Sequence, residues 1–332
     1  MKLFNFTRHS EWWEYKLVPL LAISYSTMQV AHYPLDRIIF KLIFSLIAII
    51  IGAVYVSVIN DITDIKEDLI AGKTNRLSSV KPLNRIIIVV ACIAAGVACG
   101  FFIYPDRCSL FFYFMAWVVF SLYSIPPIRL KKRGIWGVLC DAMGAHLFPT
   151  LFLVSTLTQH SESTVSASWY AGVGMWSLAY GLRGILWHQF YDRSNDLKSG
   201  TSTFASRINP LAFRYQELII FTVEIAAFLV IFIGTINIWT ILSLLLYITL
   251  VLIRKLAFHY KISLIITPLD LPHQTLMNDF YLVFFPLALL FTSAISGDNG
   301  WIILCCHLLL FPGKTMLVIH DVMSFLKSKL KK

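Results

Sequence analysis

The chain has 332 residues, of which 58% are hydrophobic and only 14% are charged, and its mean hydropathy is +0.72. This composition is far more apolar than a soluble domain needs, and several runs reach the roughly 18 residues that span a bilayer. The net charge of +10 does not indicate nucleic-acid binding, because no soluble segment carries a basic face with interleaved aromatic residues.

Local patterns argue against two other interpretations. The first residues carry too many charges for a cleavable signal peptide, among them Lys2, Arg8 and Glu11. The six cysteines form no CxxC pair and have no histidine at ligand spacing, so neither a zinc site nor a disulfide framework is expected.

Ten apolar segments follow one another along the chain. We expect the first nine to form membrane helices, and whether the tenth also spans the membrane is left open. The ten segments lie at about 17–33, 38–59, 86–104, 109–124, 135–157, 169–190, 211–234, 238–258, 279–296 and 301–320. Polar loops are expected at 60–85, 191–210 and 254–278. The sequence therefore predicts an all-α, polytopic membrane helix bundle.

The loops differ in charge according to the side of the membrane on which this layout places them. Lys and Arg gather in the loops that follow the second, fourth, sixth and eighth segments, and in the tail from Lys327 to Lys332. The intervening loops contain Arg37, Arg107 and little else. The positive-inside rule then predicts that both termini and the loops after the second and sixth segments face the cytoplasm.

Two acidic motifs lie at the cytoplasmic ends of the second and sixth segments. Four-residue spacing places Asn60, Asp64 and Asp68 on one face of a helix, and Asp192 and Asp196 on one face of another. Two acidic faces directed at a common space repel each other unless a cation lies between them, and Mg²⁺ is a hard cation that prefers oxygen ligands.

The motifs therefore predict a metal cluster that holds a diphosphate. Asn60, Asp64, Asp192 and Asp196 are the expected inner ligands. Asp61 and Asp68 are expected to bind through water or to orient the inner ligands. Solvated helix-end charges are the alternative, but they do not explain a second matching set about 130 residues later.

These motifs resemble those of the UbiA superfamily of intramembrane prenyltransferases. The family's NDxxDxxxD is matched by Asn60, Asp61, Asp64 and Asp68, and its DxxxD by Asp192 and Asp196. The stretch from Tyr123 to Pro127, with the basic run after it, is similar to the family's loop after the fourth helix. The resemblance covers about residues 15–296 of what we expect to be a single domain, with 297–332 as an additional C-terminal segment.

The resemblance implies a fold, a reaction and a cofactor. The expected fold is nine core helices around a lipid-open cavity, and the tenth segment exceeds that count. The expected reaction transfers a prenyl group from a polyprenyl diphosphate to an acceptor, with two Mg²⁺ ions and with Asp64, Asp68, Asp192 and Asp196 as the catalytic carboxylates. The metal stabilises the leaving diphosphate.

Two groups of polar residues are candidate substrate contacts. For the diphosphate they are Lys73, Arg76, Arg129 and Lys131, with Tyr123 and Ser124 as hydrogen-bond donors. For the acceptor they are the polar residues of the sixth segment, because intramembrane polar groups usually face the bundle interior: Arg183, His188 and Gln189.

Three points stay open at this stage. A second reaction within the superfamily would let a polyprenyl phosphate attack phosphoribosyl diphosphate. A transporter is a third reading, but it predicts broken helices with charges near the midplane, whereas these acids cluster at the membrane edge. The residues name neither the acceptor nor the length of the donor chain.

Overall fold

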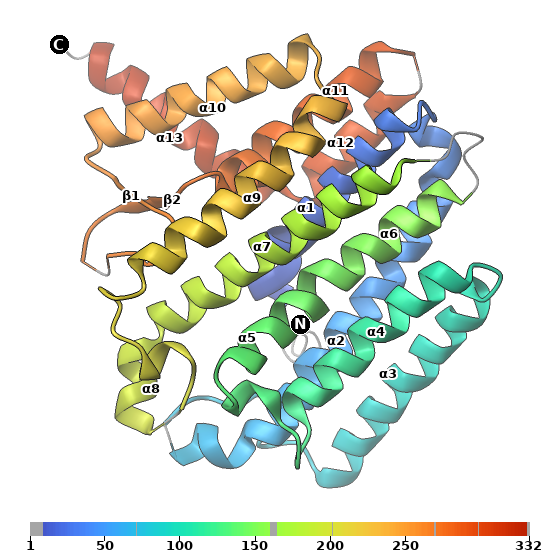
Figure 1. Cartoon of the computed structure of the whole chain (residues 1–332), viewed down its shortest axis with the longest axis vertical. Coiled ribbons are helices and arrows are strands. Elements are labelled where there is room, and N and C mark those ends of the chain that lie inside the picture. The colour runs from blue at the N-terminus through green and yellow to red at the C-terminus, as the bar shows by residue number, and fades with distance from the viewer. Residues whose placement is uncertain are drawn as a thin grey trace.

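The computed structural model describes residues 9–70, 72–159, 165–200, 202–268, 270–297 and 299–330. It is a bundle of long helices with one pair of short strands among the described residues, and most of the helices run side by side (Figure 1). The extreme ends, 1–8 and 331–332, which the sequence predicts to be cytoplasmic, lie outside the described part.

The first four helices are α1 (His9–Val30), α2 (Ile39–Ile70), α3 (Pro82–Ile103) and α4 (Arg107–Ser124). A 3-10 turn, Leu35–Ile38, precedes α2. The predicted loop at 60–85 is wrong over its first part, because α2 stays helical to Ile70. Hydropathy marks only the apolar part of a helix, and this one continues until a positive φ of 66° at Gly72 turns the chain.

The fifth predicted span is one continuous helix with an irregular centre. It consists of α5 (Ile135–Ala142), a π-helical segment (Met143–Leu147) and α6 (Phe148–Thr158). Pro149 follows the π-helical segment and cannot donate a backbone hydrogen bond to the preceding turn, so the regular ladder is interrupted here.

The middle of the chain contains α7 (Ala167–Tyr191), the short α8 (Arg193–Ser199), α9 (Arg214–Gly234) and α10 (Ile238–Ala257). These agree with the predicted sixth to eighth spans, apart from small shifts at the ends. The second acidic motif does not continue one helix as expected, because Asp192 lies at the break between α7 and α8.

The loop after α10 holds the two strands, which the sequence did not predict. β1 (Lys261–Ser263) pairs in parallel with β2 (His273–Thr275). The ninth span follows as a second π-helical segment (Phe280–Phe284) and α11 (Phe285–Ile295), with Pro286 in the equivalent place.

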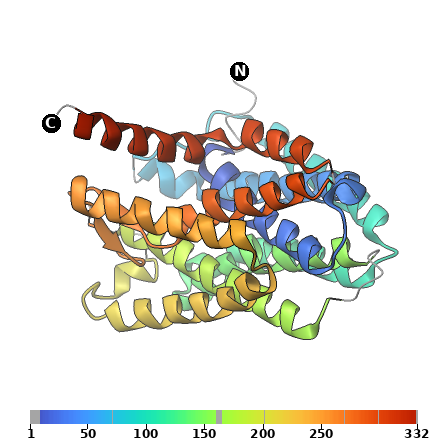
Figure 2. The same cartoon turned by 90° about the horizontal axis from the view of Figure 1, so that it is seen from above.

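The tenth apolar segment, at 301–320, does not form one continuous helix. The chain forms α12 (Gly300–Leu310) and α13 (Pro312–Leu330), which meet at an angle of 83°. In Figure 2, α13 runs along one side of the bundle toward the C-terminus. At about 1.5 Å per residue, the 11 residues of α12 are too few to cross a bilayer alone.

Among the described residues, six helical segments are long and apolar enough to cross a membrane, and the bent α12–α13 pair would be a seventh. The expected count of nine is therefore not reproduced by length and hydropathy. The helices α1 and α7 are long enough, with 22 and 25 residues, but neither is apolar enough to be among the candidate spans. Both also contribute polar side chains to the interior.

The core lies where α7, α9 and the second π-helical segment meet. Trp176 stacks on Tyr180 with ring centroids 5.3 Å apart, and Tyr281 packs edge-on against Trp176 at 5.3 Å. Phe228 lies 4.9 Å from Tyr281. These four side chains are buried, and they hold α7 in register beside the cavity described below.

Candidate active site

The first acidic motif occupies the last turns of α2. Asn60, Asp64 and Asp68 line one large cavity, as their spacing predicts. Glu67 also lines it, since a residue three positions after Asp64 lies on the same face. Asp61 is buried, with 3% of its surface exposed, and is not among the residues that line the cavity.

The loop after α2 orients Asp68 through a residue that sequence reasoning missed. Asn75 is buried, and its Nδ2 donates to Asp68 Oδ2 at 2.8 Å and to the backbone carbonyl of Asp61 at 2.8 Å. Its position in a polar loop was the only sequence signal. In the same loop Lys73 lines the cavity, whereas Arg76 is not among the lining residues.

The basic loop after α4 covers the first motif. Arg129 donates from Nη2 to Asp64 Oδ1 at 2.6 Å and from Nη1 to Glu67 Oε1 at 2.6 Å. Lys131 donates to Asn60 Oδ1 at 2.8 Å and pairs with Asp64. Burial lowers the pKa of the Lys131 amine, and the Asp64 carboxylate opposes that shift.

Other residues of this region divide between the cavity and its support. Tyr123, Lys131 and Lys132 line the cavity. Ser124 is buried and donates to Asn60 Oδ1 at 3.4 Å. Ser124 and Arg129 therefore contact the first motif without lining the cavity.

The second acidic motif approaches the same cavity from α7 and α8. Both Asp192 and Asp196 line it. Thr203 donates to Asp196 Oδ2 at 3.1 Å, and His188 Nδ1 lies 3.4 Å from Asp192 Oδ2. Burial raises the pKa of Asp196, while the hydrogen bond from Thr203 opposes that change. Gly200, with a φ of 69°, ends α8 and lets the chain turn back toward Thr203.

The cavity has a volume of about 1160 Å³, which exceeds the usual size of a small-molecule site. Its walls beyond the acidic motifs are rich in aromatic side chains: Phe112, Tyr113, Trp117, Phe120, Phe152, Tyr180 and Trp187. Trp117 stacks on Tyr55 at 4.6 Å. The site is thus an acidic mouth joined to a chamber with many aromatic side chains in its wall.

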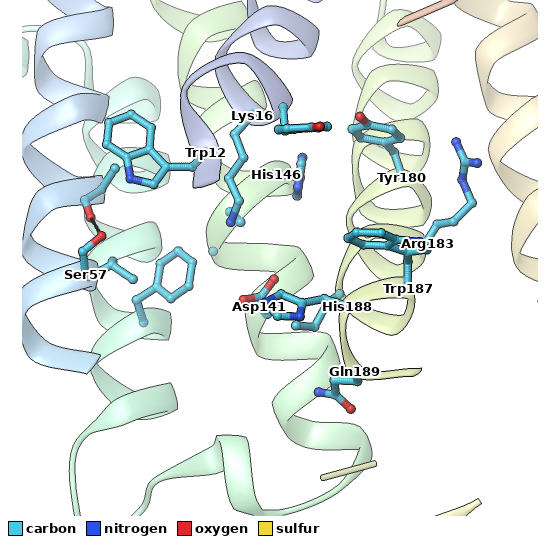
Figure 3. Close-up of a pocket in the computed structure, with 18 of the residues that line it drawn as sticks. Trp12, Lys16, Ser57, Asp141, His146, Tyr180, Arg183, Trp187, His188 and Gln189 are labelled. Atoms are coloured by element: carbon cyan, nitrogen blue, oxygen red, sulfur yellow. Dashed lines mark hydrogen bonds between the residues drawn. The ribbon is translucent and has the colours of Figure 1, made fainter. Parts of the chain in front are cut away.

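The predicted acceptor contacts all line the cavity, in different surroundings. Arg183 is buried and donates from Nε and Nη2 to Glu224 at 2.6 and 2.7 Å, and from Nη1 to the carbonyl of Leu276 at 2.6 Å. Gln189 accepts from the backbone N–H of Ala205 at 3.3 Å. In Figure 3, Arg183 points away from Asp141.

Further polar residues line the chamber although the sequence analysis assigned them no role. Lys16 comes from α1, Asp141 from α5 and His146 from the first π-helical segment. Figure 3 shows Lys16 and Trp12 reaching into the space between α2, α5 and α7. Asp141 and His146 carried a signal, because polar residues are rare within apolar spans.

The donor set fits magnesium. Asn60, Asp64, Asp68, Asp192 and Asp196 all line the cavity and carry side-chain oxygen atoms, which are the ligands that Mg²⁺ prefers. The Lys131 ammonium already lies against Asn60 and Asp64 as a cation. Within the described residues, no three His, Cys, Asp or Glu side chains come close enough to hold an ion by themselves.

Comparison with solved structures shows which known fold this chain shares. The chain resembles a UbiA homolog from Archaeoglobus fulgidus, solved bound to GPP and Mg²⁺, with a TM-score of 0.60, 15% identity and coverage of 92% of this chain and 100% of that chain. A structure bound to DMAPP and Mg²⁺ matches with a TM-score of 0.60, 14% identity and coverage of 92% and 99%. A Cd²⁺-bound structure matches with a TM-score of 0.59, 15% identity and coverage of 89% and 99%.

Sequence comparison gives the same answer at the level of the family. None of the curated proteins matches the chain. The profile of the UbiA prenyltransferase family matches residues 17–264, which confirms the resemblance read from the two motifs. Since that match covers well over half of the sequence, the chain belongs to the UbiA prenyltransferase family.

Proposed function

We propose that this protein transfers a prenyl group from a polyprenyl diphosphate to a small acceptor, aromatic or other, within the membrane. The observation that carries the proposal is that acidic side chains from α2 and from the α7–α8 junction line the same cavity, whose remaining wall contains many aromatic side chains. The acidic mouth suits a metal-bound diphosphate, and the aromatic chamber suits a prenyl chain.

The metal would be held from two sides. The proposed ligands are Asn60, Asp64 and Asp68 on one side and Asp192 and Asp196 on the other. Asp61 supports the motif from behind, since its backbone carbonyl anchors the loop after α2. Two Mg²⁺ ions are proposed, and when bound they neutralise the diphosphate as a leaving group.

The diphosphate would also meet the chain's own cations. Lys73, Lys131 and Tyr123 line the cavity and are the proposed direct contacts, with the Tyr123 hydroxyl as a hydrogen-bond donor. Arg129, Arg76 and Ser124 are proposed to contribute from outside the cavity wall. Arg129 and Ser124 form hydrogen bonds to residues of the first motif. The positive charge favours the developing negative charge of the departing diphosphate.

The reaction follows from this arrangement. The allylic C–O bond of the donor breaks, and its electron pair leaves with the diphosphate. The allylic carbon then bonds to a nucleophilic atom of the acceptor, which loses a proton. Ring faces such as those of Trp117 and Phe120 stabilise positive charge on the allyl group.

The acceptor is proposed to bind beyond the diphosphate, where Arg183, His188 and Gln189 line the cavity. We propose that the whole chain forms one catalytic domain, with its core at about 15–296, a chamber open to lipid, and both acidic motifs on the cytoplasmic side. The ligands GPP and DMAPP in the Archaeoglobus fulgidus homolog are prenyl diphosphates and support a donor of that class.

Product analysis in membranes tests the proposal. Membranes containing the protein are incubated with labelled geranyl diphosphate and a cell extract as the acceptor source, and labelled products are identified by mass spectrometry. We expect product formation to require Mg²⁺, and Asp64→Asn or Asp192→Asn to lower the rate at least about 100-fold.

Asp36→Asn is the matched control, because Asp36 accepts a hydrogen bond from Asn299 at 3.0 Å and does not line the cavity. It should leave the rate nearly unchanged. Undiminished transfer in excess EDTA, or in either motif variant, would contradict the proposed function.

A further inference from the structure

The Lys131 side chain lies among the oxygen atoms proposed to bind the metal. Its Nζ donates to Asn60 Oδ1 at 2.8 Å and forms an ion pair with Asp64 Oδ1. Its side chain is only 12% exposed. The ammonium therefore bridges two oxygen ligands that are one helical turn apart on α2.

Neighbouring cations strengthen this arrangement. Arg129 donates to the same Asp64 oxygen at 2.6 Å and to Glu67 at 2.6 Å, and Lys132 pairs with Glu67 at 2.5 Å. Three cations thus face two carboxylates, and one oxygen of Asp64 already accepts two of them. A divalent ion that arrived alone would meet like charge at this position.

The backbone of this loop is fixed, whereas the lysine stem is not. A Cβ added at Gly137 of α5 would lie 2.8 Å from the carbonyl oxygen of Leu130 and 2.9 Å from Cα of Lys131. The loop therefore packs directly on α5, through a glycine that no larger residue can replace without a shift. Movement of the ammonium must come from the four-carbon side chain, which reaches into the cavity.

We propose that Lys131 is a tethered cation that holds the first-motif metal position in the donor-free protein and transfers to the diphosphate when metal and donor bind together. The proposal rests on the proposed function and adds an order to it. Metal alone must expel the ammonium from Asn60 and Asp64 and leave it unpaired. The metal–diphosphate complex brings anionic oxygens that accept the ammonium, so metal and donor each strengthen the binding of the other.

The consequence is an effect of opposite sign on two ligands. Lys131→Met keeps a long side chain and removes the charge. Without donor, we expect it to bind Mn²⁺, a spectroscopic substitute for Mg²⁺, at least about tenfold more tightly than the unaltered protein. With Mg²⁺ present, we expect it to bind geranyl thiolodiphosphate, a slowly reacting donor analogue, at least about tenfold more weakly.

The measurement uses the full chain in lipid nanodiscs. Free Mn²⁺ is titrated by electron paramagnetic resonance, and analogue binding is followed by calorimetry. Lys131→Arg keeps a tethered charge and should leave Mn²⁺ binding weak. Lys132→Met is the matched control, since Lys132 pairs with Glu67 rather than with Asp64 and its side chain is 44% exposed. Its effect on Mn²⁺ binding should be well below that of Lys131→Met.

Each outcome has a defined meaning. If Lys131→Met binds Mn²⁺ as weakly as the unaltered protein, or more weakly, the tethered-cation proposal is overturned. Lys131→Arg shows whether a substitution at this position by itself disturbs the fold. Tighter binding that persists when Asp64→Asn is added also overturns it, because the ion then lies elsewhere. Tighter binding without prenyl transfer from any donor leaves Lys131 as proposed and rejects only the proposed reaction.

Discussion

Arg183 and Glu224 form an ion pair between α7 and α9 at the wall of the cavity. Their side chains are 3% and 0% exposed, and the arginine also binds the carbonyl of Leu276. Removing one partner of such a pair leaves an unpaired buried charge, which typically costs about 3–5 kcal/mol. We expect Arg183→Met and Glu224→Gln each to lower the thermal unfolding temperature in detergent.

The double variant Arg183→Met/Glu224→Leu separates support of the fold from contact with substrate. Since no buried charge remains unpaired, it should recover at least about half of the lost stability. If Arg183 also contacts the acceptor, the acceptor KM stays raised after stability returns. Stability losses that simply add in the double variant would show that the two charges do not depend on each other.

At the scale of single residues, the sequence identified the side chains of the acidic motifs, but it did not predict which other side chains contact them. The four-residue period placed Asn60, Asp64 and Asp68 on the cavity face, and the structure agrees. The partners of those residues come from loops. No periodicity predicts that Asn75 would reach Asp68, or that Arg129 would lie on the motif rather than in the cavity, because loop conformation depends on tertiary contacts.

Among the elements, α13 shows how the C-terminal segment is attached. The Glu14 carboxylate accepts hydrogen bonds from the first amides of α13, Gly313 at 2.6 Å and Lys314 at 2.8 Å. A carboxylate at a helix N-terminus satisfies unpaired N–H groups and the positive end of the dipole. Lys314 also lines the cavity, so this contact holds part of its wall.

Glu14→Gln tests that attachment by amide hydrogen exchange. A hydrogen bond to a charged group is worth about 1.5–3 kcal/mol, so we expect exchange at Gly313 and Lys314 to accelerate at least about tenfold. Asp106→Asn is the control, because Asp106 caps α4 through Cys108 and Ser109. Its effect should stay at α4, and unchanged exchange at α13 in Glu14→Gln would contradict the assigned contact.

The predicted helices succeeded where apolar length decides the outcome and failed where a helix is polar or broken. The bounds of α10 follow from an apolar run with Asn237 as its cap. Hydropathy ended α2 too early because its last turns are acidic, although the four-residue spacing of the first motif indicated a helix as far as Asp68. The break after α12 had a signal in Phe311-Pro312-Gly313, since proline disfavours the helical conformation in the residue before it, but hydropathy averaged over the segment concealed it.

For the whole molecule, the cavity itself could not be read from the sequence. Its existence depends on how α1, α2, α5 and α7 are rotated about their axes, and one sequence gives only the periodicity of each. The polar residues that face it lower the hydropathy of α1 and α7, which explains why neither helix is among the candidate membrane spans. A low-hydropathy helix inside a membrane bundle therefore indicates that polar side chains face an interior cavity.

The orientation of the molecule in the membrane is the last consequence of the charge pattern. Lysines and arginines gather near α8 and the acidic motifs, whereas the loop after α11 carries none. We expect the α8 side to face the cytoplasm. In a cysteine-free background, Lys198→Cys should react with a membrane-impermeant maleimide only in inverted vesicles, because Lys198 is exposed on α8. Ser296→Cys, exposed at the opposite end of the bundle after α11, should react only in intact cells. Reaction of both cysteines from the same side would contradict the helix layout, and a reversed pair would place the acidic motifs outside the cell.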